Sequence, residues 1–290
     1  MPDIDFEFTR ERDRELTEAG LTLHQRPFHV AIAWMKANNI SGPLFDNTIW
    51  SPLMTFYRQL YPSGDFSVPA LFEGGVAFRD QMYSVRVDVG FGQFSIEPIK
   101  CIEIPPEELE TIYNLERDQF WGALYCAGDV IDIAYGIDDI SHQRGEAARL
   151  FSNARSALAA TVRTLQGRLD LDTAVQSACI ASELALKGAL VCIGWTLPQV
   201  RKLSHNLVEA AETLVSERPR SSDAQLLAAC ASFPNYVTSR YTDHGLSRRE
   251  LMTLAMRSQF IVAEAVRRVT ERDLGAQLEA DQSIPPRVLP

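Results

Sequence analysis

Cysteine is scarce in this sequence and has no pattern that would bind a metal ion or build a disulfide framework. Five cysteines are spread over 290 residues, and none belongs to a Cys-x-x-Cys pair. The cysteines and the five histidines also lack the spacing of zinc ligands. We therefore expect reduced, mostly buried thiols, as is usual in the cytoplasm, and we expect neither a metal site nor another cofactor.

Long apolar runs and an N-terminal targeting signal are lacking as well. Residues 1–8 (MPDIDFEF) are acidic, unlike the basic start of a secretory signal peptide. No apolar run approaches the ~20 residues that a membrane-spanning helix needs. These absences predict a soluble, cytoplasmic protein without a membrane partner.

The chain also has little positive charge. It carries 28 Lys and Arg against 38 Asp and Glu, which gives a net charge of −10. Most of the acidic excess lies in residues 1–169, because residues 170–290 hold 13 basic and 14 acidic side chains. A protein that binds bulk duplex DNA needs a basic face, so this partner is excluded, whereas a small local anion site is not.

Glycine-rich phosphate loops are missing from residues 66–104, although this segment is rich in glycine. It has no G-x-x-x-x-G-K-[ST] motif, and the pair Gly90 and Gly92 lacks the further glycine of a dinucleotide-binding turn. Instead, glycines separate runs at 76–78, 82–89 and 94–104 whose apolar residues alternate with polar ones. This period predicts a small antiparallel sheet of three or four strands.

Helices are predicted before and after this sheet in the sequence. The helices and the sheet together form an N-terminal α+β module at residues 1–140. The expected helices lie at 9–19, 28–38, 47–61, from 107 onward, and at 120–137. The last of these carries a dense group of carboxylates, which could bind a divalent ion but which we read as a solvated helix end. These carboxylates are Asp129, Asp132, Asp138 and Asp139.

Residues 141–275 have the apolar periodicity of helices that pack into a bundle. The central helix is expected at 173–193, because apolar and alanine stripes run along two of its sides and would be buried by other helices. Capping boxes of Ser222 with Gln225 and of Ser247 with Glu250 predict two later helix starts. Further helices are expected at 147–165, 198–216 and 223–233, and residues 276–290 are expected to be a disordered tail. The predicted fold class is therefore α+β, with the small sheet preceding the bundle.

Three segments of this bundle, in order and spacing, resemble the HEPN (higher eukaryotes and prokaryotes nucleotide-binding) domain. The segments are Glu-Leu-Ala-Leu-Lys at 183–187, His-x-Leu at 205–207 and Ser-Arg-Tyr-x-Asp at 239–243. The resemblance implies an up-and-down helical bundle that forms a homodimer. Many members are ribonucleases or toxins with an antitoxin-like protein partner, and others are binding or scaffold domains without catalysis.

The residues at the matching positions are Lys187, His205, Arg240, Tyr241 and Asp243. In one interpretation the three basic side chains hold the phosphate of a nucleotide or RNA, and Tyr241 stacks on a base. In the other interpretation, His205 orients the third bundle helix. Arg240 and Tyr241 then tie the chain to the bundle through buried hydrogen bonds.

Catalytic members of the family carry an Arg followed by four to six residues and then a His, because RNA cleavage needs an imidazole for proton transfer and a guanidinium for the phosphorane charge. Here only three residues separate Arg240 from His244, and the same holds for Arg201 and His205. Either pair would share a helical face only if its segment were helical. The preferred function is nucleotide or RNA binding without efficient catalysis. The alternatives are a metal-independent ribonuclease toxin that uses His244 and Arg240, and a non-catalytic dimerisation module.

Overall fold

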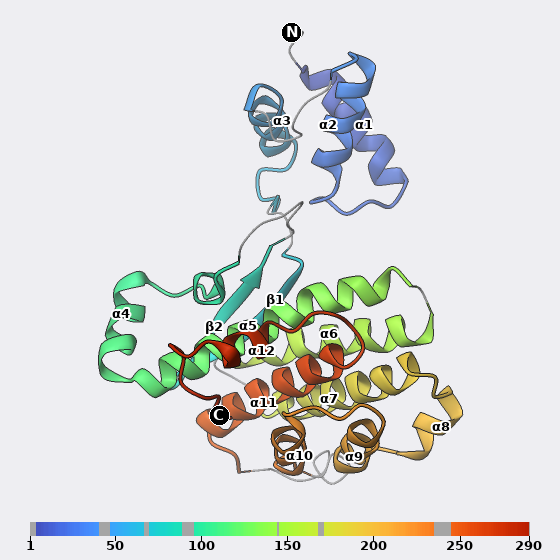
Figure 1. Ribbon diagram of the computed structural model, residues 1–290. Helices are drawn as coiled ribbons and strands as arrows, with labels where there is room; N and C mark the ends of the chain where they lie inside the picture. The colour runs from blue at the N-terminus through green and yellow to red at the C-terminus, as the bar shows by residue number, and fades with distance from the viewer. Residues whose placement is uncertain are drawn as a thin grey trace. The chain divides into compact units, whose positions relative to one another are not determined.

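The protein consists of two compact units, residues 1–69 and residues 70–290. The structure is a computed structural model that describes residues 4–40, 47–66, 70–88, 96–143, 145–167, 171–234 and 245–289. A small antiparallel sheet lies early in the chain and a helical bundle follows it, which confirms the predicted α+β class (Figure 1). The division of the chain falls at residue 69, whereas the sequence predicted a boundary near residue 140.

The described part of the first unit is helical. It contains α1 (Phe6–Glu18), α2 (Arg26–Ala37) and α3 (Asn47–Leu60). Its core is aromatic and aliphatic, with Trp34, Leu53 and Tyr57 all buried. The carboxylate of Asp13 accepts a hydrogen bond of 3.2 Å from Arg26 Nη1, so a buried ion pair joins α1 to α2.

The sheet belongs to the second unit and has two strands in the described residues, β1 (Phe72–Phe78) and β2 (Gln81–Val87). Phe78 pairs with Gln81 across a tight turn, and Arg79 has the positive φ of 57° that such turns require. The prediction of a further strand at 94–104 is wrong for the described residues of that segment. They form a 3₁₀ turn, η1 (Pro98–Cys101), and a single bridge between Val85 and Ile102.

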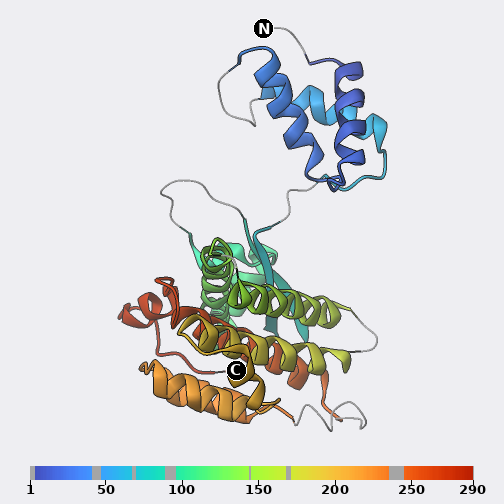
Figure 2. The ribbon, with the colours of Figure 1, turned by 90° about the vertical axis from the view of Figure 1, so that its right-hand side faces the viewer.

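The remaining elements among the described residues of the second unit are α-helices. They are α4 (Pro106–Leu115), α5 (Arg117–Ser141), α6 (Glu146–Gln166), α7 (Thr173–Cys192), α8 (Leu197–Lys202), α9 (Leu207–Glu217), α10 (Asp223–Ala231), α11 (Arg248–Arg267) and α12 (Leu274–Ala280). Figures 1 and 2 show α6, α7 and α11 running side by side, and β1 packs against α5, α6 and α11. The strands and the bundle helices therefore share one hydrophobic core, which explains why the boundary expected near residue 140 is not observed.

The central helix α7 is enclosed by the other helices, as its two apolar stripes predicted. Apart from Thr173 and Gln176, its residues are buried or half-buried. Within the described residues, α7 is also the one helix long and apolar enough to cross a membrane, but 61% of its apolar window is buried inside the protein. This burial is the pattern of a core helix in a soluble protein.

Two other predictions from the sequence are corrected by the structure. The helix expected at 198–216 is broken into α8 and α9, because Ser204 adopts a left-handed conformation with φ of 51°. Residues 276–289, expected to be disordered, include the end of α12 and an ordered segment beyond it. The Tyr125 hydroxyl donates a 2.8 Å hydrogen bond to the carbonyl of Pro285, and the Arg287 side chain is buried.

The thiols are free, as the cysteine pattern predicted. Cys126, Cys179 and Cys230 are buried, and Cys101 and Cys192 are half-buried. Burial raises the pKa of Cys179 and Cys230 to about 12 and also raises the pKa of Cys126.

Close approach between α5 and α11 depends on a glycine. A Cβ atom added at Gly136 would lie 2.1 Å from Val266 Cγ1, whereas a Cβ atom added at Gly122, also inside α5, would meet no atom within 4 Å. Glycine inside a helix costs ~0.5–1 kcal/mol relative to alanine, so its presence at position 136 reflects packing and not helix propensity.

We predict that Gly136→Ala destabilises the protein by about 1–3 kcal/mol, because the added methyl group overpacks the contact with Val266. Gly122→Ala is the matched control in the same helix and should stabilise the protein by about 0.5–1 kcal/mol. Urea unfolding followed by circular dichroism measures both effects. Equal shifts in the same direction would contradict the packing described for α5 and α11.

Candidate functional site

Two of the residues predicted to form a site, Lys187 and His205, lie close together. Both contact the carboxylate of Glu183, which lies one turn before Lys187 on α7. Lys187 Nζ is 2.6 Å from Glu183 Oε1, and His205 Nδ1 is 2.8 Å from Glu183 Oε2. A carboxylate can only accept, so Nδ1 carries the proton and donates it. The cluster of Glu183, Lys187 and His205 is called the α7–α9 cluster below.

Lys187 stabilises the turn between α8 and α9. Its ammonium group also donates a 2.5 Å hydrogen bond to the carbonyl of Ser204, the residue with left-handed backbone. The Lys187 side chain is 10% exposed, and its charge is balanced by Glu183. The lysine therefore holds the turn in place by donating to two described acceptors, the carboxylate of Glu183 and the carbonyl of Ser204.

His205 is presented at the surface by this turn. Its side chain is 46% exposed, and it precedes α9 by two residues. The intervening residue, Asn206, caps α9 by accepting a 3.2 Å hydrogen bond from the backbone N–H of Glu209. The ring is thus oriented by Glu183 on one side and fixed by a capped helix start on the other.

Arg201 does not share a helical face with His205, although it lies four residues earlier. The helix α8 ends at Lys202, and the left-handed Ser204 interrupts the helical path between the two side chains. The other predicted site residues, Arg240, Tyr241, Asp243 and His244, lie outside the described residues. Of the predicted site, the structure therefore describes Lys187 and His205.

The carboxylates of α5 form a different cluster from the one expected. Asp129 and Asp132 are buried and face an arginine of α11, so the interpretation as a solvated helix end is wrong for these two. Arg267 Nη2 donates to Asp129 Oδ1 at 2.7 Å, and Arg267 Nε donates to Asp132 Oδ2 at 2.7 Å. No group of residues in the described ranges has the arrangement of a metal site. Only Asp138 and Asp139 remain near the surface, as expected.

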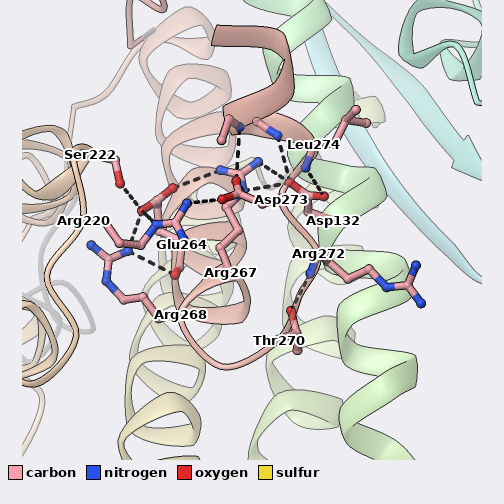
Figure 3. Close-up of polar contacts among 12 residues, drawn as sticks. Asp132, Arg220, Ser222, Glu264, Arg267, Arg268, Thr270, Arg272, Asp273 and Leu274 are labelled. Carbon is pink, nitrogen blue, oxygen red and sulfur yellow. Dashed lines mark hydrogen bonds and ion pairs between the residues drawn. The ribbon is translucent and has the colours of Figure 1, made fainter. Parts of the chain in front are cut away.

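Arg267 is the centre of this buried network, which Figure 3 shows at the junction of α5, α11 and α12. Its side chain is 1% exposed, and it also donates to Glu264 at 3.0 Å. Asp132 in turn accepts from the backbone N–H groups of Leu274 and Gly275 at 2.9 and 3.2 Å. The network therefore fixes the start of α12 against the two long helices.

Glu264 extends the network from Arg267 toward α10. Its second oxygen accepts from Arg268 at 2.5 Å and from the hydroxyl of Ser222, and Arg268 also binds Asp223 at 2.5 Å. Ser222 was predicted to form a capping box with Gln225, but its hydroxyl is used by Glu264 instead, and no side-chain cap is present. In contrast, the capping box at Ser247 and Glu250 is present as predicted.

The charged groups of this network shift each other's pKa values, in some cases against the effect of burial. Burial raises the pKa of Glu264, but the guanidinium groups of Arg267 and Arg268 outweigh it and lower this pKa from 4.5 to about 2. At Asp132 burial prevails over the nearby Arg267, and the pKa is raised. Burial lowers the pKa of Arg267, yet the surrounding carboxylates raise it well above its ordinary value.

A hollow of about 460 Å³ lies elsewhere on the second unit, beside the start of α5 and the start of α11. Its remaining walls come from the end of β1 and from residues 285–289. The latter are held in place by Arg287, which pairs with Asp129 and lies over the Tyr125 ring at 5.2 Å. This hollow is called the α5–α11 cavity below.

The pairing within the buried network could not be predicted from the sequence, but one signal was present. Glu264, Arg267 and Arg268 interrupt an apolar run in α11 that otherwise faces the bundle. Charged residues within a buried face need partners, so this interruption indicates a buried ion-pair network. The positions of the partners follow only from the three-dimensional arrangement.

No protein family, curated protein or solved structure matches this chain in comparisons with known proteins.

We predict that Arg267→Met destabilises the protein by about 3–5 kcal/mol, because it leaves buried carboxylates without their cation. Arg272→Ala is the control: Arg272 binds Asp139, but both side chains are at least 40% exposed, and such pairs contribute ~0–1 kcal/mol. Chemical unfolding of both variants tests the difference. Comparable losses of unfolding free energy in the two variants would show that the buried network stabilises the protein no more than an exposed ion pair does.

The lowered pKa of Glu264 also predicts a specific acid sensitivity. The group has a pKa of 4.5 when unfolded and about 2 when folded, so its contribution to stability is complete above pH 4.5 and is lost as the pH falls through 2. The loss amounts to about 3 kcal/mol between pH 5 and pH 2. The raised pKa of Asp132 acts with the opposite sign, because protonation of Asp132 favours the folded state.

The free energy of unfolding of Glu264→Gln should therefore depend less steeply on pH over this range than that of the parent. The comparison uses the slope with pH and not the absolute stability, so it remains informative if the variant is destabilised overall. Parallel slopes in the two proteins would contradict the assigned role of Glu264.

Proposed function

We propose that the protein binds a nucleotide or RNA at the α7–α9 cluster, without efficient catalysis, as the resemblance to HEPN domains implies. In this proposal His205 contacts a phosphate oxygen, and Arg240, Tyr241 and Asp243 complete the site. Lys187 acts indirectly: it holds Ser204 and Glu183, which in turn position the imidazole.

The observation that supports this proposal is the meeting of Glu183, Lys187 and His205 at one surface turn. These residues lie in two separate segments of the resemblance. The contact with Glu183 orients the imidazole, and a doubly protonated ring that donates its Nδ1–H to this carboxylate still has its Nε2–H to donate to an anion. Preorganisation of this kind reduces the entropy lost on binding, so few contacts are needed for useful affinity.

The α7–α9 cluster supports RNA cleavage less well than it supports binding. Cleavage needs a cation free to stabilise the charge of the transition state. Lys187 is enclosed and paired with Glu183. Arg201 does not share a helical face with His205, because the left-handed backbone at Ser204 interrupts the helix between them. The alternative, a ribonuclease toxin that uses Arg240 and His244, rests on residues outside the described ranges.

We take the bundle to form a homodimer in the cytoplasm. An antitoxin-like protein is the partner that the family resemblance implies if the protein acts in a toxin–antitoxin, stress or defence system. The competing proposal, a dimerisation module without a ligand, requires the same dimer. Light scattering over a range of concentrations tests this point, and a monomer throughout would remove the dimerisation module from consideration.

We predict that His205→Ala weakens binding of ATP, GTP or a short fluorescent RNA by about tenfold, equivalent to ~1.4 kcal/mol, because a charge-assisted hydrogen bond is lost. Fluorescence anisotropy and thermal shift measure the effect. The matched control is His142→Ala, since His142 is also exposed and lies 3.6 Å from a carboxylate, that of Asp138. Its removal should leave binding unchanged.

Incubation of the same RNA with the purified protein separates the remaining alternative. We expect no efficient cleavage by the parent. Cleavage that disappears in His244→Ala but persists in His142→Ala would replace the binding proposal with the ribonuclease one. If the protein bound none of ATP, GTP and the RNA at millimolar ligand concentration, the proposed function itself would be rejected.

A further inference from the structure

The α5–α11 cavity has the size and lining of a site for a small organic molecule. Its volume of about 460 Å³ lies within the ~300–1,000 Å³ range of ligand pockets. It shares no residue with the α7–α9 cluster, and its walls come from β1, α5, α11 and residues 285–289. Binding of a molecule in this cavity is therefore independent of the proposed function.

Most of the cavity wall is apolar and includes an aromatic ring. The indole of Trp121 lines it, together with the thioether side chains of Met252 and Met256. Val288 also lines the cavity, yet 79% of this residue is exposed to water. An occupant with a flat apolar surface would stack on Trp121 and cover Val288, which would bury apolar area now in contact with solvent.

Three polar side chains at the cavity are not engaged with other described residues. They are Asp118 at the start of α5, and Arg249 and Thr253 on α11. By contrast, Arg79 at the same cavity already binds Glu116, with Nε at 2.6 Å from the carboxylate. One guanidinium and one carboxylate therefore remain to meet an occupant, which fits a molecule that has both an anionic group and a hydrogen-bond donor.

We propose that the α5–α11 cavity binds a flat aromatic molecule that carries one anionic group and at least one N–H or O–H donor. Arg249 pairs with the anionic group, Asp118 accepts from the donor, and Trp121 with the methionines covers the ring system. Each interaction uses a side chain that has no other described partner or an apolar surface that lines the cavity.

Gly122 gives a way to fill the cavity without harming the fold. This glycine lines the cavity from inside α5, and a Cβ atom placed on it meets no atom within 4 Å. Leucine is a better helix former than glycine, so Gly122→Leu should fold at least as well as the parent while its side chain occupies the cavity. Gly122→Ala is the matched control that leaves most of the volume open.

The probe for the experiment is anilinonaphthalene sulfonate, whose fused rings, single sulfonate and bridging N–H correspond to the three proposed interactions. Its fluorescence rises in apolar surroundings, so a titration of the full chain gives a dissociation constant. We expect saturable binding with one probe per chain, weakened about tenfold or more in Gly122→Leu and changed less than about twofold in Gly122→Ala.

The anionic group is tested with phenylnaphthylamine, which has the same rings and N–H but no sulfonate. It should bind the parent about fivefold to tenfold more weakly than the sulfonate, and this difference should vanish in Arg249→Ala. Arg163→Ala removes an exposed arginine from α6 and should leave the difference intact.

Binding of the sulfonate to Gly122→Leu with the affinity of the parent would overturn the proposal, because the probe would then lie elsewhere. Equal binding of the two probes by the parent would overturn the assignment of Arg249 to an anion. Circular dichroism melting of each variant confirms that lost binding does not reflect lost structure.

Discussion

Arg267 on α11 is the buried charge on which the arrangement of the second unit depends. Its guanidinium is surrounded by Asp129 and Asp132 of α5 and by Glu264 of its own helix, and Asp132 also accepts from the backbone at the start of α12. A guanidinium without these partners could not remain buried, because removing a charge from water costs several kcal/mol. The network therefore fixes the rotation of α11 relative to α5 more specifically than apolar contacts could. Gly275 allows it to close, since a Cβ atom there would lie 2.5 Å from Arg267 Nη2.

Two buried ion pairs, one in this network and one on α7, also shape the surface of the second unit. Arg287 uses Asp129 to hold residues 285–289 beside α5, and these residues then become one wall of the α5–α11 cavity. On α7, the ion pair of Lys187 with Glu183 supports a left-handed turn that exposes His205. In both places a buried ion pair fixes the backbone of a nearby segment, residues 285–289 in one case and the turn at Ser204 in the other.

Local patterns predicted much of the fold, because helix periodicity, capping residues and turn residues act over a few positions. The burial of α7, the capping box of Ser247 with Glu250 and the sheet of Met82–Val87 with its neighbour all follow from such patterns.

The partners of Asp129 could not be found in this way. They lie 138 and 158 residues later in the chain, at Arg267 and Arg287. The break at Ser204 was missed for a related reason: Lys187, which supports it, is 17 residues away on another helix. Of the predicted site, the convergence of Lys187 and His205 followed from the family resemblance and not from any local pattern.

Burial of the cysteines has a consequence for how the molecule can be followed in solution. A thiol reacts with alkylating or oxidising reagents as the thiolate, and the raised pKa values of Cys126, Cys179 and Cys230 keep nearly all of each thiol protonated at neutral pH. Because these side chains are also shielded from reagent, their modification requires the surrounding helices to separate first. The rate at which they are alkylated is then a measure of how often the hydrophobic core opens, which makes the three residues natural reporters of breathing motions within the bundle.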